Sequence, residues 1–368
     1  MMERIKRQKN KSKKLVSKPT KPIWPTAVMC TVAMLCLVIG IIGYKTQLIQ
    51  YMINRSLEWR IRLWEGSQEI HSGKDIRYDY YFDKLAVTML QKDYYTKLVL
   101  KDNGPNHLFG IGSIAMNDGN HHMKVSSYTD WVGPYNLLDE SSGQAGFVGG
   151  WHAKEEWFFK VPTAKTISTR LWADGQVIKG LSAGSCQVLE IEVVNDITDI
   201  EGDDKLLQET VRYTIDRSGV KIHTETRAVK HVTIEKYYGL QTQNMGWDGA
   251  IYYHLQDGKD LGYSLKIPSQ GGQGGGIHGY RYTLTDNVHP FCLSAWLDSS
   301  EGLGDFSQLG EDQPCMFTIG YHVNTGDDQS KTYFNLINGH PLTLEPGQVI
   351  TWSGGYQFFL AQPPETNE

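Results

Sequence analysis

Residues 209–234 read ETVRYTIDRSGVKIHTETRAVKHVTI and contain the clearest structural signal in the chain. In their first part, Val211, Tyr213 and Ile215 alternate with polar residues, and an Arg-Ser-Gly turn follows. The alternation continues over residues 220–238, a length that suits one or two further strands. A period of two predicts antiparallel strands with one buried face and one face in solvent.

Short runs of β-branched and aromatic residues extend this pattern in both directions along the chain. Turn signals separate them, among them Asp174-Gly175 and Asn338-Gly339. No long amphipathic helix pattern follows residue 66. We therefore predict an all-β fold in which residues 67–368 form one large, supersandwich-like β-sandwich, with two fused sandwiches as the alternative. The other predicted strands include residues 97–101, 167–173, 187–194, 317–322 and 349–352.

An apolar segment near the N-terminus predicts a membrane anchor. Residues 26–44 read TAVMCTVAMLCLVIGIIGY, and a helix of this length spans about 28 Å, close to the thickness of a bilayer core. Residues 1–25 carry nine Lys or Arg and one Glu, which predicts a cytoplasmic N-terminus. The apolar run is too long for a typical signal peptide, and no small-x-small cleavage site follows it. We expect a single-pass cell-membrane protein with a transmembrane helix over residues 26–45.

A further helical segment follows the predicted transmembrane helix, and the chain beyond the basic tail is acidic. Residues 46–66 continue a helical pattern, and the apolar positions of 47–65 suit a stalk, an interfacial helix or a seam for a homo-oligomer. The chain beyond residue 25 carries 27 Lys or Arg against 40 Asp or Glu. An acidic body of this kind argues against nucleic acid as a partner. We expect residues 67–368 to be extracytoplasmic.

The cysteines do not indicate a disulfide scaffold or a metal site. Cys186, Cys292 and Cys315 lie in the predicted β domain, and their odd number allows at most one internal disulfide. No Cys-x-x-Cys motif is present, and the adjacent His121 and His122 point to opposite faces of any strand. We therefore expect neither a metal nor a cofactor.

The densest group of polar and aromatic residues lies between positions 121 and 157. Imidazole and carboxyl groups can share proton transfer, and aromatic faces can stack on sugar rings. A glycine-rich loop at 269–279 adds further polar candidates. The candidates for catalysis are His152, Asp130, His278, Arg281 and Tyr128. The candidates for ligand binding are Trp131, Tyr135, Trp151, Trp157, His121 and His122.

A set of short motifs in the same region resembles a known family. Residues 128–135 read YTDWVGPY, residues 147–152 read FVGGWH, and PTA at 162–164 and RLWADG at 170–175 follow. This pattern resembles a β-rich module of Gram-positive bacterial and prophage proteins, including tail-associated structural proteins, over residues 120–175. The resemblance implies a bacterial cell-surface setting and a glycan or wall polymer as the ligand.

Three functions remain open at this point. The first is a membrane-anchored protein that binds a carbohydrate of the cell envelope. The second is an enzyme on the same fold, a polysaccharide lyase or glycoside hydrolase, with His152 or His278 as base, Tyr128 or Tyr135 as acid and Arg281 facing a substrate carboxylate. The third is a structural or assembly protein of the envelope. Convergence of His152, Asp130 and His278 in one cleft would favour the enzyme. A flat aromatic strip without buried titratable groups would favour simple binding, and the absence of both would favour assembly.

Overall fold

The computed structural model describes residues 74–81, 83–126, 129–139, 142–156, 159–265, 279–319 and 330–361. The chain divides into two compact units, Met1–Ile70 and His71–Glu368, and all described residues belong to the second. The predicted tail, transmembrane helix and stalk thus lie outside the described residues. Within the ranges given above, no helical segment has the length and apolarity needed to cross a membrane.

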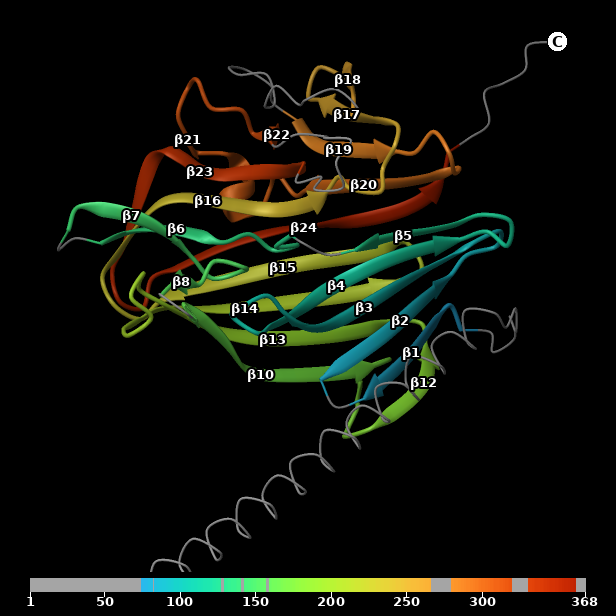
Figure 1. Cartoon of the computed structure of the whole chain (residues 1–368), viewed down its shortest axis with the longest axis horizontal. Coiled ribbons are helices and arrows are strands. Elements are labelled where there is room, and N and C mark those ends of the chain that lie inside the picture. Colours follow the sequence, from blue (N-terminus) through green and yellow to red (C-terminus); the bar gives the residue numbers. More distant parts are fainter. Residues whose placement is uncertain are drawn as a thin grey trace, which may run out of the picture. The chain divides into compact units, whose positions relative to one another are not determined.

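The described part of the chain is built from β-strands, as the alternating pattern predicts (Figure 1). Residues 209–228 lie in two strands that pair antiparallel across the Arg-Ser-Gly turn. They belong to a ten-stranded sheet in which all neighbouring strands are antiparallel. Its strands are, in spatial order, β11 (Gln176–Val177), β10 (Ala164–Ala173), β13 (Leu189–Thr198), β14 (Lys205–Asp216), β15 (Gly219–Ala228), β24 (Val349–Leu360), β20 (Phe291–Leu297), β19 (Gly279–Thr285), β17 (Ala250–Leu255) and β18 (Asp260–Ser264).

A second sheet, which we call the N-terminal sheet, is an antiparallel meander of consecutive strands with one later strand added at its edge. Its strands are, in spatial order, β12 (Ser182–Cys186), β1 (Ile76–Tyr81), β2 (Lys84–Leu90), β3 (Tyr95–Asn103), β4 (Leu108–Asn117) and β5 (His122–Ser126).

A third sheet, which we call the β16 sheet, joins strands that are distant in sequence. Its strands are, in spatial order, β21 (Gln308–Leu309), β23 (Lys331–Leu344), β16 (Val232–Gln243), β6 (Tyr135–Asp139) and β7 (Gln144–Val148), with β22 (Met316–Ile319) also paired to β23. A short hairpin of β8 (Lys154–Glu155) and β9 (Lys160–Val161) and a 3₁₀ turn, η1 (Gly302–Asp305), complete the described elements.

Both smaller sheets pack on the same face of the ten-stranded sheet (Figure 1). Tyr213 of β14 packs against β4 of the N-terminal sheet. Trp352 of β24 donates its indole N–H to the Tyr237 hydroxyl of the β16 sheet at 2.8 Å. The strand register places these contacts on one face, because Val211 opposes Thr224 and Thr224 opposes Trp352. The apolar positions of each strand therefore fill one continuous core between two layers.

One local expectation from the sequence needs correction. Asn338-Gly339 was expected to form a turn, but both residues lie inside β23, where Gly339 has a φ of +93° and β21 pairs irregularly beside it. The sequence allowed at most one internal disulfide and left open whether it forms; Cys186, Cys292 and Cys315 are buried thiols that form no disulfide with one another. The expected strand over residues 317–322 is described only to residue 319.

Candidate functional site

Four aromatic rings pack together on one face of the β16 sheet, and we call them the aromatic shelf. They are Phe147, Tyr238, Phe317 and Tyr333, with ring centroids of Tyr238 at 5.7, 5.4 and 5.2 Å from the other three in that order. Tyr237 points into the core, so its neighbour Tyr238 projects from the opposite face of the strand. Tyr333 is buried, whereas the other three rings are partly exposed. The shelf thus offers aromatic surface to solvent.

Three titratable residues lie beside the shelf, and we call them the titratable trio: Asp130, His152 and Lys331. The ring centroids of His152 and Phe147 are 5.1 Å apart, with the rings tilted by 32°, and Nε2 of His152 lies 3.8 Å from Oδ2 of Asp130. The Asp130 side chain is 2% exposed and that of His152 is 44% exposed. The ammonium group of Lys331 influences the pKa of both neighbours. The trio therefore joins one buried carboxyl group to an imidazole that solvent can reach.

The environment shifts the proton affinities of the whole trio. Burial raises the pKa of Asp130 to about 7, although the Lys331 ammonium and the backbone N–H of Trp151 oppose this rise. Burial lowers the pKa of His152, and the nearby Lys331 charge adds to this effect. Burial also lowers the pKa of Lys331, with Asp130 acting against it. At neutral pH the trio can both hold and accept a proton, as acid–base chemistry requires.

Asp130 reaches its position because glycine lies directly against it. Gly150 has a φ of +50°, and a Cβ atom on it would lie 2.3 Å from Oδ1 of Asp130. A side chain at position 150 would displace the carboxyl group. Among the described residues, Oδ1 of Asp130 is buried without a hydrogen-bond partner.

A buried asparagine fixes the turn that carries His152. The Asn106 side chain donates to the carbonyl oxygens of Gly150 at 3.0 Å and of His152 at 3.2 Å. Its Oδ1 atom accepts the backbone N–H of Thr163 at 2.8 Å. On the other side of the site, Gly133 donates its N–H to the carbonyl of Gly239 in β16 at 2.9 Å. Hydrogen bonds from Asn106 and from β16 thus hold the segments that carry His152 and Asp130.

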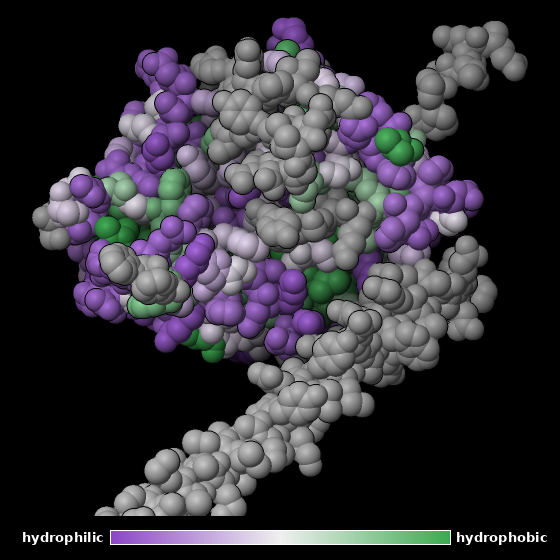
Figure 2. All heavy atoms as spheres, viewed as in Figure 1, coloured by the Kyte–Doolittle hydropathy of each residue, from purple (hydrophilic) through white to green (hydrophobic). Residues whose placement is uncertain are grey.

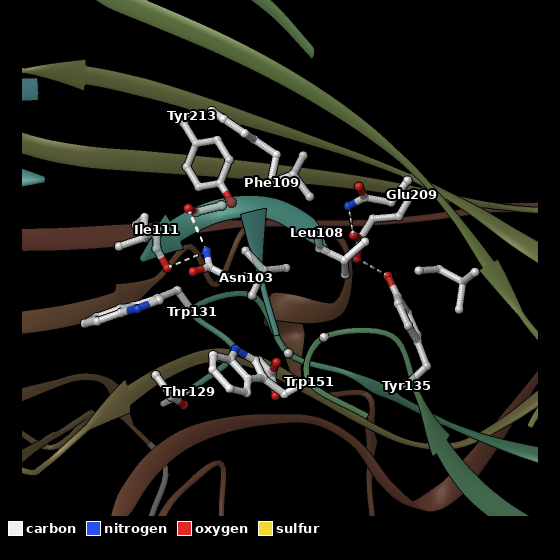
Figure 3. Close-up of a pocket in the computed structure, with 18 residues that line it drawn as sticks. Asn103, Leu108, Phe109, Ile111, Thr129, Trp131, Tyr135, Trp151, Glu209 and Tyr213 are labelled. Atoms are coloured by element: carbon white, nitrogen blue, oxygen red, sulfur yellow. Dashed lines mark hydrogen bonds between the residues drawn. The ribbon is translucent and has the colours of Figure 1, made fainter. Parts of the chain in front are cut away.

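A partly open pocket of about 50 Å³ lies among these residues (Figure 3), and Asp130 belongs to its lining. Trp131 and Trp151 line one side of it, and Tyr135 and Glu209 line another. Like Oδ1 of Asp130, the indole N–H of Trp131 is buried without a hydrogen-bond partner among the described residues. The volume is sufficient for a few water molecules, which can satisfy such polar atoms.

A fully buried carboxyl group, that of Glu209, also lines this pocket. Glu209 accepts hydrogen bonds from the Tyr135 hydroxyl at 2.8 Å and from Nδ2 of Asn195 at 2.9 Å. Tyr135 stacks on Tyr237 with centroids 4.3 Å apart, and its hydroxyl also contacts Thr226 at 2.6 Å. Burial raises the pKa of Glu209, and the Glu209 charge in turn raises that of Asp130. The two buried carboxyl groups therefore influence each other electrostatically.

The structure brings together only part of the set of residues named from the sequence. Asp130 and His152 form the trio with Lys331. Trp131 and Tyr135 were expected to bind ligand, but they are 3% and 1% exposed and lie in the core. The Trp151 side chain is partly buried and lines the pocket.

The other named residues lie elsewhere or outside the described ranges. His121 and His122 are exposed at the start of β5. Arg281 is exposed on β19, opposite His254 of β17. Tyr128, Trp157 and His278 lie outside the described residues, as does most of the loop at 269–279. In the described ranges, no group of three or more His, Cys, Asp or Glu residues is arranged to hold a metal ion.

Sequence reasoning missed the residues that come from distant strands. Lys331, Tyr333, Tyr238 and Phe317 were not candidates, although they complete the trio and the shelf. Their strands carry only the general signal of alternating aromatic and polar residues. The strand register brings these residues together, because Tyr333 of β23 lies opposite Phe317 of β22 on one side and opposite Gln241 of β16 on the other.

Comparisons with known proteins give low similarity. No family model and no curated protein matches the chain. Among solved structures, the chain is similar to an α-galactosidase from Lactobacillus brevis (TM-score 0.42, 9% identity), covering 79% of this chain and 40% of that one. It is also similar to a galactose mutarotase-like protein from Clostridium acetobutylicum (TM-score 0.42, 8% identity; 78% of this chain, 100% of that one). A glycoside hydrolase family 97 enzyme from Pseudoalteromonas sp. strain K8 has a TM-score of 0.40 and 10% identity, covering 72% and 34%. These scores are too low to assign a fold family.

Proposed function

We propose that this chain is a membrane-anchored, extracytoplasmic protein that binds a carbohydrate or related polymer of the cell envelope on the aromatic shelf. The observation that carries the proposal is the contact between partly exposed aromatic rings and the titratable trio. Aromatic faces bury the C–H surfaces of a sugar ring, while nearby polar groups bind its hydroxyls. The anchor and the setting rest on residues 1–45 and on the family resemblance.

The rest of the described surface fits a soluble-polymer ligand better than an apolar partner. Figure 2 shows a face on which hydrophilic side chains predominate and hydrophobic ones form small, separate patches. The exposed large apolar residues, such as Phe159 and Val288, belong to different parts of the chain. Scattered residues of this kind are normal on protein surfaces.

The test measures binding of the full-length chain to bacterial wall and capsular polysaccharides by affinity gel electrophoresis. Tyr238→Ala and Phe317→Ala remove shelf rings and should weaken binding about tenfold, a loss of about 1.4 kcal/mol. Phe359→Ala removes an aromatic ring that is 38% exposed on β24 and should leave binding unchanged. Binding that is insensitive to both shelf variants, or no binding to any polymer, would overturn the proposal.

A second candidate is an acid–base enzyme at the same site. The observation that favours it is Asp130, whose pKa burial raises to about 7, only 3.8 Å from His152. At neutral pH, the unprotonated His152 can take a proton from substrate carbon and protonated Asp130 can give one to the leaving oxygen. This elimination, in which a C=C bond forms as the C–O bond breaks, is the chemistry of a polysaccharide lyase. Hydrolysis normally needs two carboxyl groups on either side of the bond, and the described neighbour, Glu209, is enclosed in the core.

The enzyme is tested by following the absorbance of unsaturated uronides with the same polymers. Product that disappears in both His152→Ala and Asp130→Asn would establish the lyase. Polymer binding without product would leave the binding function alone.

A further inference from the structure

A surface hollow of about 360 Å³ lies on strands β17, β18 and β19, at one edge of the ten-stranded sheet (Figure 1). Small-molecule sites in proteins typically have volumes of about 300–1,000 Å³, so the hollow is large enough for a ligand. It shares no residue with the aromatic shelf or the titratable trio. We call it the β18 hollow.

Small side chains from three neighbouring strands form the floor of the β18 hollow. Ser264 of β18 lies opposite Ala250 of β17, and residues opposite each other in an antiparallel pair project from the same face. The Thr285 hydroxyl of β19 accepts the backbone N–H of Ala250 at 3.0 Å. Asn287, in the turn after β19, also lines the hollow and donates to the carbonyl oxygen of Asp248 at 2.9 Å. The floor therefore carries hydroxyl and amide groups but no bulky side chain.

An exposed aromatic ring forms one wall of the hollow. Tyr252 of β17 is 39% exposed, whereas its neighbour Tyr253 is buried and its hydroxyl contacts Thr318 of β22. Adjacent residues of a strand point to opposite faces, so Tyr252 projects from the outer face of the sheet. Gly262 lies opposite it in β18, and a Cβ atom there would come within 2.9 Å of Cε1 of the Tyr252 ring. The glycine thus lets the ring lie across the edge strand, beside the floor.

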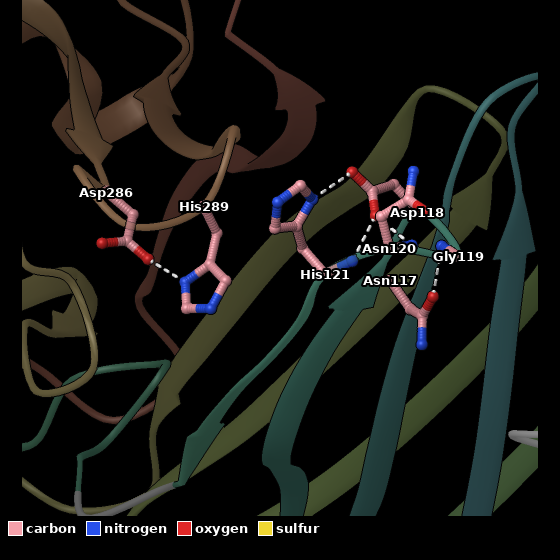
Figure 4. Close-up of polar contacts among 7 residues, drawn as sticks. All are labelled: Asn117, Asp118, Gly119, Asn120, His121, Asp286 and His289. Atoms are coloured by element: carbon pink, nitrogen blue, oxygen red, sulfur yellow. Dashed lines mark hydrogen bonds and ion pairs between the residues drawn. The ribbon is translucent and has the colours of Figure 1, made fainter.

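A histidine connects the three strands next to Tyr252. Nδ1 of His254 lies 2.8 Å from Oδ1 of Asp260 on β18, and its Nε2 atom lies 2.8 Å from the Thr283 hydroxyl on β19. Both ring nitrogens are therefore occupied, and the imidazole joins strands rather than binding a ligand. In two other Asp–His pairs, only Nδ1 has a hydrogen-bond partner among the described residues, and the two imidazole rings meet edge-on with centroids 6.1 Å apart (Figure 4): Asp118–His121 and Asp286–His289. His254 thus fixes the strands on either side of Tyr252.

A positively charged side chain without a partner lies in the same row of the sheet. Arg281 of β19 is exposed and lies opposite His254. It has no hydrogen bond or ion pair among the described residues, because Asp260 pairs with His254 instead. The other arginines in the described part of the chain all have an interaction partner: Arg77, Arg170, Arg212, Arg217 and Arg227. An unpaired guanidinium group presents a planar fork that matches a carboxylate, so Arg281 indicates an anionic ligand group.

We propose that the β18 hollow binds an acidic saccharide, with a sugar ring against Tyr252 and a uronate carboxylate on Arg281. In the register, Tyr252 lies opposite Thr283, two residues from Arg281. Such diagonal neighbours are about 7–8 Å apart, within reach of a long arginine side chain. The hydroxyl and amide groups of the floor then bind sugar hydroxyls. This site is distinct from the aromatic shelf and does not depend on the function proposed for the shelf.

The test measures binding of trigalacturonate to the full-length chain by calorimetry. The measurement is made in the wild type and in a Tyr238→Ala/Phe317→Ala background, which lacks two rings of the shelf. We expect binding in this background, and Tyr252→Ala and Arg281→Gln should each weaken it about tenfold. Added salt should weaken binding when Arg281 is present and have little effect in Arg281→Gln, because salt screens the charge pair.

Two variants and two further probes serve as controls. Arg170→Gln removes an exposed arginine from β10 of the same sheet and should leave the affinity unchanged. Tyr252→Phe keeps the ring and should retain most of the affinity. The methyl ester of trigalacturonate keeps the sugar rings without the charge and should bind about tenfold more weakly. Oligo(glycerol phosphate) supplies anions without sugar rings and should not bind.

Urea unfolding of each variant shows whether it is folded. Three results would overturn the proposal: no trigalacturonate binding in the shelf double variant, unchanged binding in both Tyr252→Ala and Arg281→Gln, or equal binding of the methyl ester. Binding of oligo(glycerol phosphate) as tight as that of trigalacturonate would also overturn it. None of these results changes the outcome for the shelf, because that function is tested by the Tyr238→Ala and Phe317→Ala variants with the polymers.

Discussion

Several neighbouring groups together determine the position and the pKa of the Asp130 carboxyl group. Gly150 makes room for this group, and the pocket that it lines leaves Oδ1 without a partner among the described residues. Burial disfavours the charged form, so its pKa is about 7 although Lys331 is near. A buried carboxyl group in this state costs stability when it ionises. Strongly shifted pKa values of this kind cluster at functional sites.

Asp130 should make the folded state less stable as the pH rises. In the unfolded chain its pKa returns to the ordinary value of 3.8, so between pH 4 and 7 the unfolded state binds fewer protons than the folded one. The free energy of unfolding then falls as pH increases. Between pH 5 and pH 8 the wild type should lose about 3 kcal/mol more than Asp130→Asn, as measured by urea unfolding.

The comparison with Asp130→Asn isolates this group from the rest of the chain. Asparagine has the same shape but does not titrate, while His152 and Lys331 titrate in both proteins. The same pH dependence in the two proteins would show that Asp130 does not hold a proton at neutral pH.

Buried hydrogen bonds join strands that belong to different sheets. Strand β6 of the β16 sheet meets β14 of the ten-stranded sheet through Tyr135 and Glu209, and β16 meets β24 through Tyr237 and Trp352. Buried hydrogen bonds of this kind define which strands face each other, because an unpaired polar group in the core is costly. Apolar packing alone would tolerate small shifts between the layers.

Tyr135→Phe should therefore destabilise the protein through the contact between β6 and β14. The variant keeps the ring stacked on Tyr237 but removes one of the hydrogen bonds to Glu209. We expect a loss of about 1–3 kcal/mol in the free energy of unfolding, measured with urea. Tyr252→Phe, at a ring that is 39% exposed, is the control and should change stability by less than about 0.5 kcal/mol. Equal effects of the two variants would contradict this account.

At the scale of the whole molecule, one core between large sheets stabilises the described unit without covalent links. Cys186, Cys292 and Cys315 lie in different sheets or connections and are buried as thiols, with no disulfide between them. Burial raises the pKa of each thiol to about 11. Only about one thiol in a thousand is then ionised at pH 8, and the thiolate is the reactive form.

Thiol labelling tests this arrangement. In a Cys30→Ser/Cys36→Ser background, the native protein should resist a maleimide at pH 8. In urea without a reducing agent, three thiols per chain should react, as counted by mass spectrometry. Only one reactive thiol in urea would mean that two of the cysteines form a disulfide.

Part of the candidate site could be predicted because its residues lie close together in sequence. Asp130 and His152 belong to one polar and aromatic segment, and short turns can bring such residues together. Lys331 and Tyr333 lie about 180 residues further along the chain, so only strand pairing places them there. The same limit explains why His121 was judged only against its neighbour His122. Its facing ring, His289, comes from another sheet.

The sequence by itself determined the all-β class and the pairing of residues 209–216 with 219–228, because a period of two and a tight turn are local properties. It also determined which face is apolar in the strands at residues 188–193, 209–216 and 220–235, where apolar and polar residues alternate. Only the tertiary structure decided that residues 220–238 divide between two sheets, since β15 pairs with β24 and β16 pairs with β23. Strand partners are chosen by shape and hydrogen bonding across long chain separations. For the same reason, the aromatic shelf, the buried state of Trp131 and the facing histidines emerged only from the folded chain.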